Sequence, residues 1–466
     1  MAFPCVNPRL FSRFQAPAWE RISAKLCFAA LVFCLLTVIL SGCQTSEPDP
    51  ESSSDPPPSA NRPLCVIASG DTHGWIIPCG CTSNQSGGLL RRGTYVAEKQ
   101  QEANVIAVDV GGAADGTAAY QKERFRAILK GQAQMPYVAH NLGAAEIAFG
   151  ADTLQELSAD TGVTFISANT SADGKPIAAS HIVSDSFGLK LLIVGVVSPD
   201  FATGGIAVTE PTAAVLSVLD QVAGNYDRLI VLAYLPVDQL RSLAESLPEA
   251  DIVIGGPTGQ ALTPEKVGRT LVTSATNKGK FLAEVTFTSP ERPPAAVVVE
   301  MSDSIADHVK QKANLAAFRS FLEERDFKAH ESGFADNSSL TAGSQHSIAG
   351  TESCADCHDE TNTHWATTGH SHAWQRLVDE GAHVDPYCQQ CHTTGYGLDK
   401  GFLSAKLTLS RTQVGCESCH GPSSAHVADS SVRTPFDAAG TCLKCHDPEN
   451  SPHFEYDSYW KKVQHE

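Results

Sequence analysis

The chain has 466 residues, which is enough for about two to three domains, and 42% of them are hydrophobic, which excludes a wholly disordered protein. Asp and Glu outnumber Lys and Arg by 52 to 34, and the net charge of −18 argues against a nucleic acid as partner, since phosphate binding needs a positive surface. Eight of the 15 Cys and 11 of the 17 His lie in residues 350–466. This C-terminal quarter therefore has a chemistry of its own.

Residues 1–42 have the features of an export signal. A basic segment is followed by an apolar run of 15 residues, 26–40, and then by small residues. That run is short for a membrane span, which needs about 20 residues. The sequence LSGC at 40–43 resembles a bacterial lipobox, which implies that Cys43 is lipidated; an uncleaved anchor helix is the alternative. We expect an exported protein, on the periplasmic side or the cell surface, that is lipid-anchored to a membrane.

The remainder of the chain divides by composition. Residues 43–62 are Pro, Ser and acidic residues with almost nothing apolar, which predicts a tether. A globular region is expected over 63–328, and its last part, 304–328, has the apolar spacing of one connecting or packing helix (Val309, Leu315, Phe318, Phe321, Leu322). Residues 329–349 are predicted to be a second linker, which leaves 350–466 as a small separate domain.

Apolar runs of strand length alternate with helical patterns in the globular region, which predicts an α/β sheet covered by helices. Three later strands are predicted to run antiparallel around the turn at 277–279. The expected strands are 64–69, 104–110, 163–168, 189–197, 228–235, 251–256, 271–276, 281–288 and 295–301, and the expected helices are 118–132, 151–159, 212–223 and 237–247.

The loops at the strand ends carry a series of characteristic strings. They are SGDTHG at 69–74, SGGLLRR at 86–92, VDVGG at 108–112, NLGAAE at 141–146 and IGGPTG at 254–259. In order and spacing they resemble the calcineurin-like metallophosphoesterases, specifically the 5′-nucleotidase and UDP-sugar hydrolase branch, over roughly residues 64–290. The resemblance implies a layered αββα sandwich in which two metal ions activate water and clamp a phosphate.

Most of that family's metal positions are lost in this chain. Asp71 and His73 match the first Asp-x-His pair and would be vestigial ligands, and Asp115 is a candidate to replace one lost ligand. Two side chains cannot hold two dications, because hard cations need several ligands each. The fold is therefore expected to be kept and the hydrolase activity lost. The other six positions are occupied by Gly112, Ala144, Ala145, Tyr234, Pro257 and Gly259.

Three cysteines lie in the globular region: Cys65, Cys79 and Cys81. One interpretation is a structural disulfide from Cys65 to one of the other two. The other is a redox-active pair, Cys79 and Cys81, or a thiolate metal site, because a disulfide across a single residue closes a tight ring and is easily reduced.

Four copies of Cys-x-x-Cys-His stand in the C-terminal quarter. In this pattern the two thiols add to the vinyl groups of a haem and the adjacent His binds the iron as proximal ligand. Zinc bound by four thiolates is the rival interpretation, but the export signal and the His after every second Cys favour four covalently bound haem c groups. The copies are Cys354, Cys357 and His358; Cys388, Cys391 and His392; Cys416, Cys419 and His420; and Cys442, Cys445 and His446.

The residues between the motifs indicate the distal iron ligands. No Met lies beyond residue 301, so ligation by Met from within this domain is excluded and haems of lower potential are expected. WATTGHSHA at 365–373, TTGYG at 393–397, GPSSAH at 421–426 and YWKKVQH at 459–465 resemble the tetrahaem cytochrome c family that accepts electrons from hydroxylamine oxidation in nitrifiers.

That resemblance implies a distal ligand for three of the haems. His426 would bind the first haem, His370 the fourth and His465 the third. The second haem, on His392, matches the family's five-coordinate site, although another histidine could close it. The candidates are His364, His372, His383 and His453.

Together these features predict a membrane-tethered multihaem cytochrome that carries electrons between redox partner proteins. Haem propionates would add to the net charge of −18, so a partner with a basic docking patch is expected. The alternatives are a haem-dependent reductase of a small nitrogen or oxygen species at an open haem on His392, a thiol-redox or binding module that feeds the haems through Cys79 and Cys81, and an active 5′-nucleotidase-type hydrolase.

Overall fold

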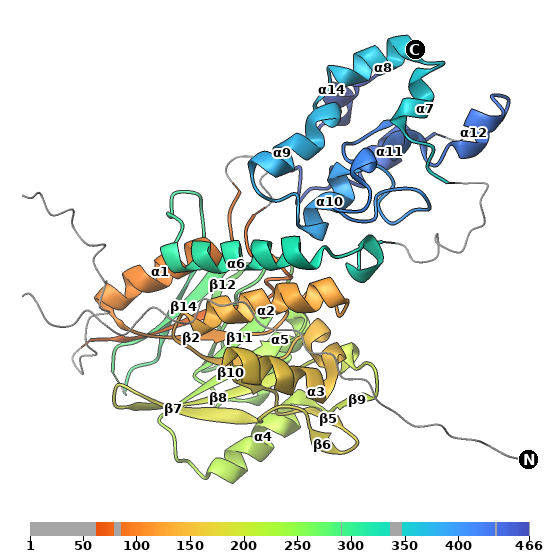
Figure 1. The fold of residues 1–466 in the computed structure, drawn as a ribbon. Helices are drawn as coiled ribbons and strands as arrows, with labels where there is room; N and C mark the ends of the chain where they lie inside the picture. Colours follow the sequence, from red (N-terminus) through yellow and green to blue (C-terminus); the bar gives the residue numbers. More distant parts are fainter. Residues whose placement is uncertain (1–61, 79–84, 290, 336–346, 434–435, 466) are drawn as a thin grey trace, which may run out of the picture. The chain divides into compact units, whose positions relative to one another are not determined.

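The computed structural model describes residues 62–78, 85–289, 291–335, 347–433 and 436–465 (Figure 1). The predicted signal, Cys43, almost all of the tether, and the pair Cys79 and Cys81 lie outside these ranges. None of the helices within them is long and apolar enough to cross a membrane.

The first sheet of the α/β region has six strands in the order β15-β14-β1-β2-β3-β4. Strands β1 to β4 run parallel, β14 pairs antiparallel with β1, and β15 pairs antiparallel with β14. Every residue of β1 and β2 is buried, as expected for strands covered on both faces. The strands are β1 Leu64–Ser69, β2 Asn104–Asp109, β3 Tyr137–Asn141, β4 Phe165–Ile166, β14 Phe281–Phe287 and β15 Ala295–Glu300.

The second sheet has the order β12-β13-β11-β10-β8-β7. Its four inner strands are parallel, whereas β7 and β12 are antiparallel edges. A small third sheet contains β5 Thr170–Ala172, β6 Lys175–Pro176 and β9 Ile206–Val208. The strands of the second sheet are β7 His181–Ser186, β8 Leu189–Val197, β10 Arg228–Tyr234, β11 Ile252–Gly256, β12 Leu262–Val267 and β13 Thr270–Ser274.

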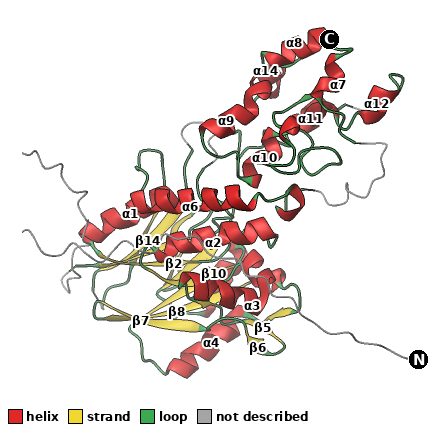
Figure 2. Ribbon diagram, viewed as in Figure 1, coloured by secondary structure: helices red, strands yellow, loops and turns green. Residues whose placement is uncertain are grey.

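Three apolar layers hold the two sheets and their helices together. The middle layer joins the sheets face to face, with Val66 and Val108 of the first sheet in one cluster with Ile193 and Leu232 of the second. The outer layers pack α1, α2, α3 and α6 on the first sheet and α4 and α5 on the second, so helices flank the strands on both sides (Figure 2). The expected αββα sandwich is confirmed. The helices are α1 Leu89–Glu102, α2 Ala119–Ala133, α3 Ala144–Thr161, α4 Pro211–Val222, α5 Val237–Ser246 and α6 Val309–Arg325.

One predicted strand pairing is wrong. Strand β13 pairs with β11 and β12 in the second sheet, whereas β14 pairs with β1 and β15 in the first. The turn at 277–279, in which all three residues have positive φ, therefore carries the chain from one sheet to the other. An alternating pattern predicts a strand, but it does not indicate which other strand will pair with it. In α6, Phe318 and Leu322 are buried as expected, but Val309 and Phe321 are exposed.

The C-terminal region consists of short helices joined by turns. The longest of them, α8, has eight residues. The described residues 347–465 bury six apolar side chains: Ile348, Ala373, Leu377, Ala382, Val384 and Phe402. The polypeptide therefore supplies only a small core there. The helices are α7 Thr351–Ala355, α8 Asp359–Ala366, α9 Ala373–Asp379, α10 Pro386–His392, α11 Cys416–His420, α12 Ser424–Ala428, α13 Ala438–Cys442 and α14 Tyr456–Trp460.

Candidate functional site

The Cys-x-x-Cys-His motifs lie on or at the ends of short helices. The second motif occupies α10 and the third occupies α11, whereas the first begins in α7 and the fourth begins at the last residue of α13. Positions i, i+3 and i+4 lie on one face of a helix. The helical turn therefore presents both sulfurs and the imidazole of a motif on the same side, as attachment to one planar ring requires.

Three of the predicted proximal histidines face the distal histidines that the sequence resemblance implies. The ring centroids are 6.3 Å apart in His358 and His426, 6.2 Å apart in His446 and His370, and 5.7 Å apart in His420 and His465. Two metal–nitrogen bonds of about 2 Å each, with the half-widths of two rings, place the centroids roughly 6 Å apart. Each pair is thus spaced to hold one iron between two imidazoles.

Backbone carbonyls orient several of these imidazoles. The Nδ1 atom lies 2.8 Å from the Ala373 oxygen in His392, 2.7 Å from the Val432 oxygen in His426 and 3.1 Å from the Val463 oxygen in His465. A carbonyl only accepts, so Nδ1 donates its proton and Nε2 is left as the atom that can bind a metal. The sequence carries no signal for these contacts, because any residue has a carbonyl group.

Burial favours the neutral form of four of the predicted ligands. Removal from water lowers the pKa of His370, His392, His420 and His446, with burial as the largest cause in each. The neutral imidazole is the form that binds a metal, so the lowered pKa favours ligation at neutral pH.

At the edge of the α/β region that corresponds to the metallophosphoesterase metal site, an aromatic side chain takes the place of metal ligands. A side chain at Gly112 would place its Cβ 2.5 Å from Cε2 and 2.9 Å from the hydroxyl oxygen of Tyr234. The Tyr234 ring, at the end of β10, therefore takes the space that any larger residue at 112 would need. Burial, and then the nearby Asp71 and Glu146, raise the pKa of Tyr234, so its phenol stays protonated.

The two vestigial residues lie on a tight loop after β1. Asp71 and His73 both have a φ of 49°. Asp71 accepts a hydrogen bond from Thr276 Oγ1 at 3.0 Å, and its burial raises its pKa, whereas His73 is exposed. The carboxylate of Asp115, the candidate replacement ligand, is paired with Arg124 at 2.9 Å. Its role as a ligand stays a prediction. Among the described residues, no group of three or more His, Cys, Asp and Glu is arranged to hold a metal ion.

Cys65 is a free and buried thiol on β1. Burial, followed by the charge of Glu284, raises its pKa to about 12, which leaves the thiol protonated and unreactive at neutral pH. Within the described residues Cys65 therefore forms no disulfide, and its two expected partners, Cys79 and Cys81, lie outside them.

The C-terminal region and the α/β region resemble different known proteins. Residues 353–421 match the model of the family described as cytochrome c554 and c-prime. Cytochrome c-554 of Nitrosomonas europaea is 32% identical over 88 residues, which are 16% of this chain and 37% of that protein. The C-terminal region carries a cytochrome c554-type domain. The matched segment includes the first three Cys-x-x-Cys-His motifs, and the match to this family implies covalently bound haem c.

The α/β region has relatives of another kind. The uncharacterized metallophosphoesterase YunD of Bacillus subtilis is 24% identical over 157 residues, which are 32% of this chain and 33% of that protein. The structure of a 5′-nucleotidase precursor from Thermus thermophilus superposes with a TM-score of 0.49 at 18% identity, and the match covers 56% of this chain and 59% of that one. The chain thus spans about a third of the length of each curated relative.

Within the cytochrome c554-type domain the motifs adjoin in two pairs. Cys354 lies beside Cys416, and Cys445 lies beside Cys391. The buried carboxylate of Glu417 accepts from the backbone N–H groups of residues 349 and 350, at 2.9 and 2.7 Å. Glu417 therefore ties the third motif to the start of α7, which carries the first. It lies between two motif residues in the sequence, where nothing distinguishes it from a surface glutamate.

The four other candidates for the second haem lie in separate places. His364 is in α8, His372 directly precedes α9, and His453 follows the fourth motif. His383 lies edge-on to Trp374, with the ring centroids 6.0 Å apart, and its carbonyl accepts from the Gln389 side chain at 2.7 Å.

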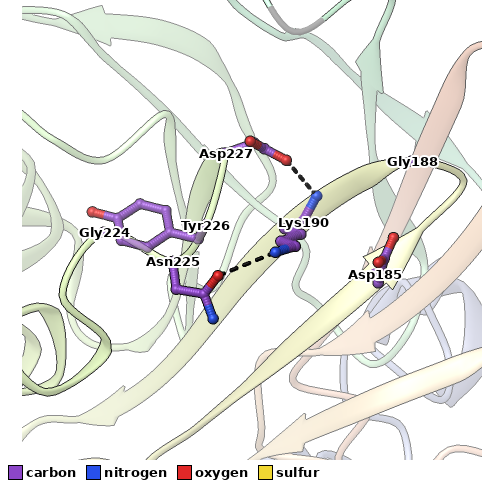
Figure 3. A pocket seen from close by; sticks show the side chains of 7 residues that line it. All are labelled: Asp185, Gly188, Lys190, Gly224, Asn225, Tyr226 and Asp227. Atoms are coloured by element: carbon purple, nitrogen blue, oxygen red, sulfur yellow. Dashed lines mark hydrogen bonds between the residues drawn. The ribbon is translucent and has the colours of Figure 1, made fainter.

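A shallow polar pocket lies elsewhere in the α/β region, at the start of β8 and β10 (Figure 3). Its lysine, Lys190, reaches Asn225 Oδ1 at 3.1 Å, and the Lys190 backbone N–H donates to Asp227 at 2.8 Å. Ligands of open α/β sheets bind at the carboxyl ends of the parallel strands. This pocket lies at the amino ends of these strands, and Lys190, Asn225 and Asp227 pair with one another there.

Proposed function

We propose that this protein is an exported, lipid-tethered electron carrier with four covalently bound haem c groups. The observation that carries the proposal is the facing of three histidine pairs, each with one member in a Cys-x-x-Cys-His motif, at centroid distances of 5.7 to 6.3 Å. When bound, each haem supplies a one-electron couple at its iron. A pair of imidazoles fills both axial positions, so these three sites favour relay of electrons over binding of a substrate.

The predicted export signal and tether support a location outside the cytoplasm. We place the protein on the periplasmic side of a membrane or on the cell surface, anchored through lipidated Cys43, with residues 43–62 as the tether. The net charge of −18 favours redox partners with a basic docking surface. We further propose that residues 63–328 are a phosphoesterase-like domain without hydrolase activity, joined by 329–349 to the haem domain at 350–466.

The decisive test is a haem count by pyridine haemochrome with electron paramagnetic resonance of the oxidised holoprotein. We expect four haems per chain, three of them low-spin because each has two imidazole ligands. Fewer than four haems, or high-spin signals from more than one, would contradict the proposal. A single high-spin haem would favour the second candidate function, reduction of a small nitrogen or oxygen species at the haem on His392, which the resemblance to the five-coordinate site supports.

Loss of hydrolase activity is tested separately. With Mn²⁺ or Zn²⁺, we expect neither phosphate release from a nucleotide nor cleavage of a nucleotide sugar above that of an Asp71→Ala variant. The reason is that Tyr234 occupies the space beside Gly112 and that Ala144 and Ala145 offer no ligand atoms. A metal-dependent activity that Asp71→Ala abolishes would show that the metal site still works.

A further inference from the structure

Helix α10 carries all the attachments of the second haem. It has seven residues, Pro386–His392, and they include Cys388, Cys391 and His392. Its N-terminus is capped by Asp385, whose carboxylate accepts from the Tyr387 backbone N–H at 3.0 Å. A haem bound at three points to one short helix moves with that helix, so the contacts that hold the helix also hold the haem.

The first such contact comes from α2 of the α/β region, which belongs to the same compact unit, residues 55–466. The Tyr120 hydroxyl donates to Asp385 Oδ1 at 2.5 Å. Tyr120 is fully buried, and the rings of Phe318, Phe327 and Phe334 lie within 6.5 Å of its centroid. The tyrosine is therefore locked in one position, and the carboxylate that caps α10 is bound to it.

The second contact is one helical turn further along α2. The Arg124 guanidinium lies 4.3 Å from the centre of the Tyr387 ring, a cation–π distance, and is paired with Asp115 at 2.9 Å. The side chains of Arg124 and Asp115 are each only 6% exposed. A buried charge needs such partners, and it interacts more strongly with its surroundings than a charge in water does.

Helix α2, which carries both Tyr120 and Arg124, is held rigidly. On α2, Phe125, Ile128 and Leu129 have no exposed surface and pack in the core cluster that covers the first sheet. Close-packed interiors transmit displacement rather than absorb it. Tyr387 also donates to Asn450 Oδ1 at 3.2 Å, and Lys280 pairs with Glu449 at 2.8 Å, so contacts extend to the loop after the fourth motif.

We propose that Tyr120 and Arg124 are positioning residues for the haem on His392 and that they set its reduction potential. This inference rests on the proposed function. The positive charge of Arg124 favours the ferrous state, which carries one positive charge fewer than the ferric state, and the Tyr120 hydroxyl offsets the negative charge of Asp385. Removal of either leaves the surroundings of the second motif more negative and makes reduction harder. The α/β domain then acts as a fixed support that tunes one haem.

The test is a spectroelectrochemical titration of the full-length holoprotein. Arg124→Gln and Tyr120→Phe should each move the same one of the four reduction steps to lower potential. We expect about a tenfold change in the ferrous-to-ferric ratio, or about 59 mV for a one-electron couple. His392→Met identifies that step, because a methionine ligand raises the potential of its own haem. The matched control is Arg126→Gln on the same helix, whose charge pairs instead with Glu156 and Asp160, and it should move no step.

Several outcomes would overturn the inference. They are four unmoved steps, four steps that move equally, or movement of a step that His392→Met leaves unchanged. A lower melting temperature with unchanged potentials would show that the two residues are merely structural. If Arg124→Gln does not fold, Tyr120→Phe decides alone, since it removes only an oxygen atom. A wild-type protein without four haems would instead refute the proposed function, so the two failures are distinguishable.

Discussion

Without covalent haem, residues 347–465 will lose their fold while the α/β domain keeps its own. The described part of this region buries six apolar side chains, and its helices have at most eight residues. Helices that short are not stable alone in water, and a core this small cannot offset the entropy of ordering the chain. The haems must supply most of the apolar surface, so haem attachment and folding are coupled.

The measurement is limited proteolysis of protein made in a host that lacks cytochrome c maturation. Cleavage should be confined to the C-terminal region and complete there, while a fragment beginning before β1 and ending after α6 persists. A variant in which the first Cys of each motif is replaced by Ala should behave in the same way. Cys65→Ala, which removes a buried thiol outside the motifs, should retain all haem and stay protected. Equal protection of the haem-free C-terminal region would show that the polypeptide folds without its cofactor.

Removal of one distal histidine will convert one haem per chain from low-spin to high-spin. His426→Ala empties the position opposite His358, and His370→Ala empties the position opposite His446, where the ring centroids are 6.3 and 6.2 Å apart. An iron with a single imidazole has a weaker axial field and an open coordination position, so it becomes high-spin and binds small ligands. Electron paramagnetic resonance and the binding of nitric oxide or cyanide will record the change.

The matched control is His330→Ala, because His330 is exposed and lies outside the haem motifs. It should leave all signals as they are. Each distal variant should change the spin state of only its own haem, so a double variant should produce two high-spin haems. Unchanged low-spin spectra in both single variants would mean that these histidines are not ligands.

Much of the fold follows from local patterns. The apolar runs at β1, β8 and β10 indicate strands, because a strand buried on both faces needs apolar side chains throughout. Helix α1 was not predicted, and neither were β7 and β12, which are edge strands with few buried residues. The turn at 277–279 was predicted as a turn, but the sheet that each flanking strand joins depends on residues far away in the chain.

The sequence by itself determined the covalent chemistry of the C-terminal quarter. Two cysteines and a histidine at i, i+3 and i+4 meet on any helical turn, so the motif is complete within five residues. Only the tertiary structure decided what surrounds it: the carbonyl behind His392, the carboxylate of Glu417 under the first motif, and the hydroxyl of Tyr120 on Asp385, 265 positions away. It likewise showed the Tyr234 ring beside Gly112 and the pairing of Asp115 with Arg124. Local chemistry is encoded by neighbours in the chain, whereas the environment of a site is made by packing between distant segments, and no short pattern contains it.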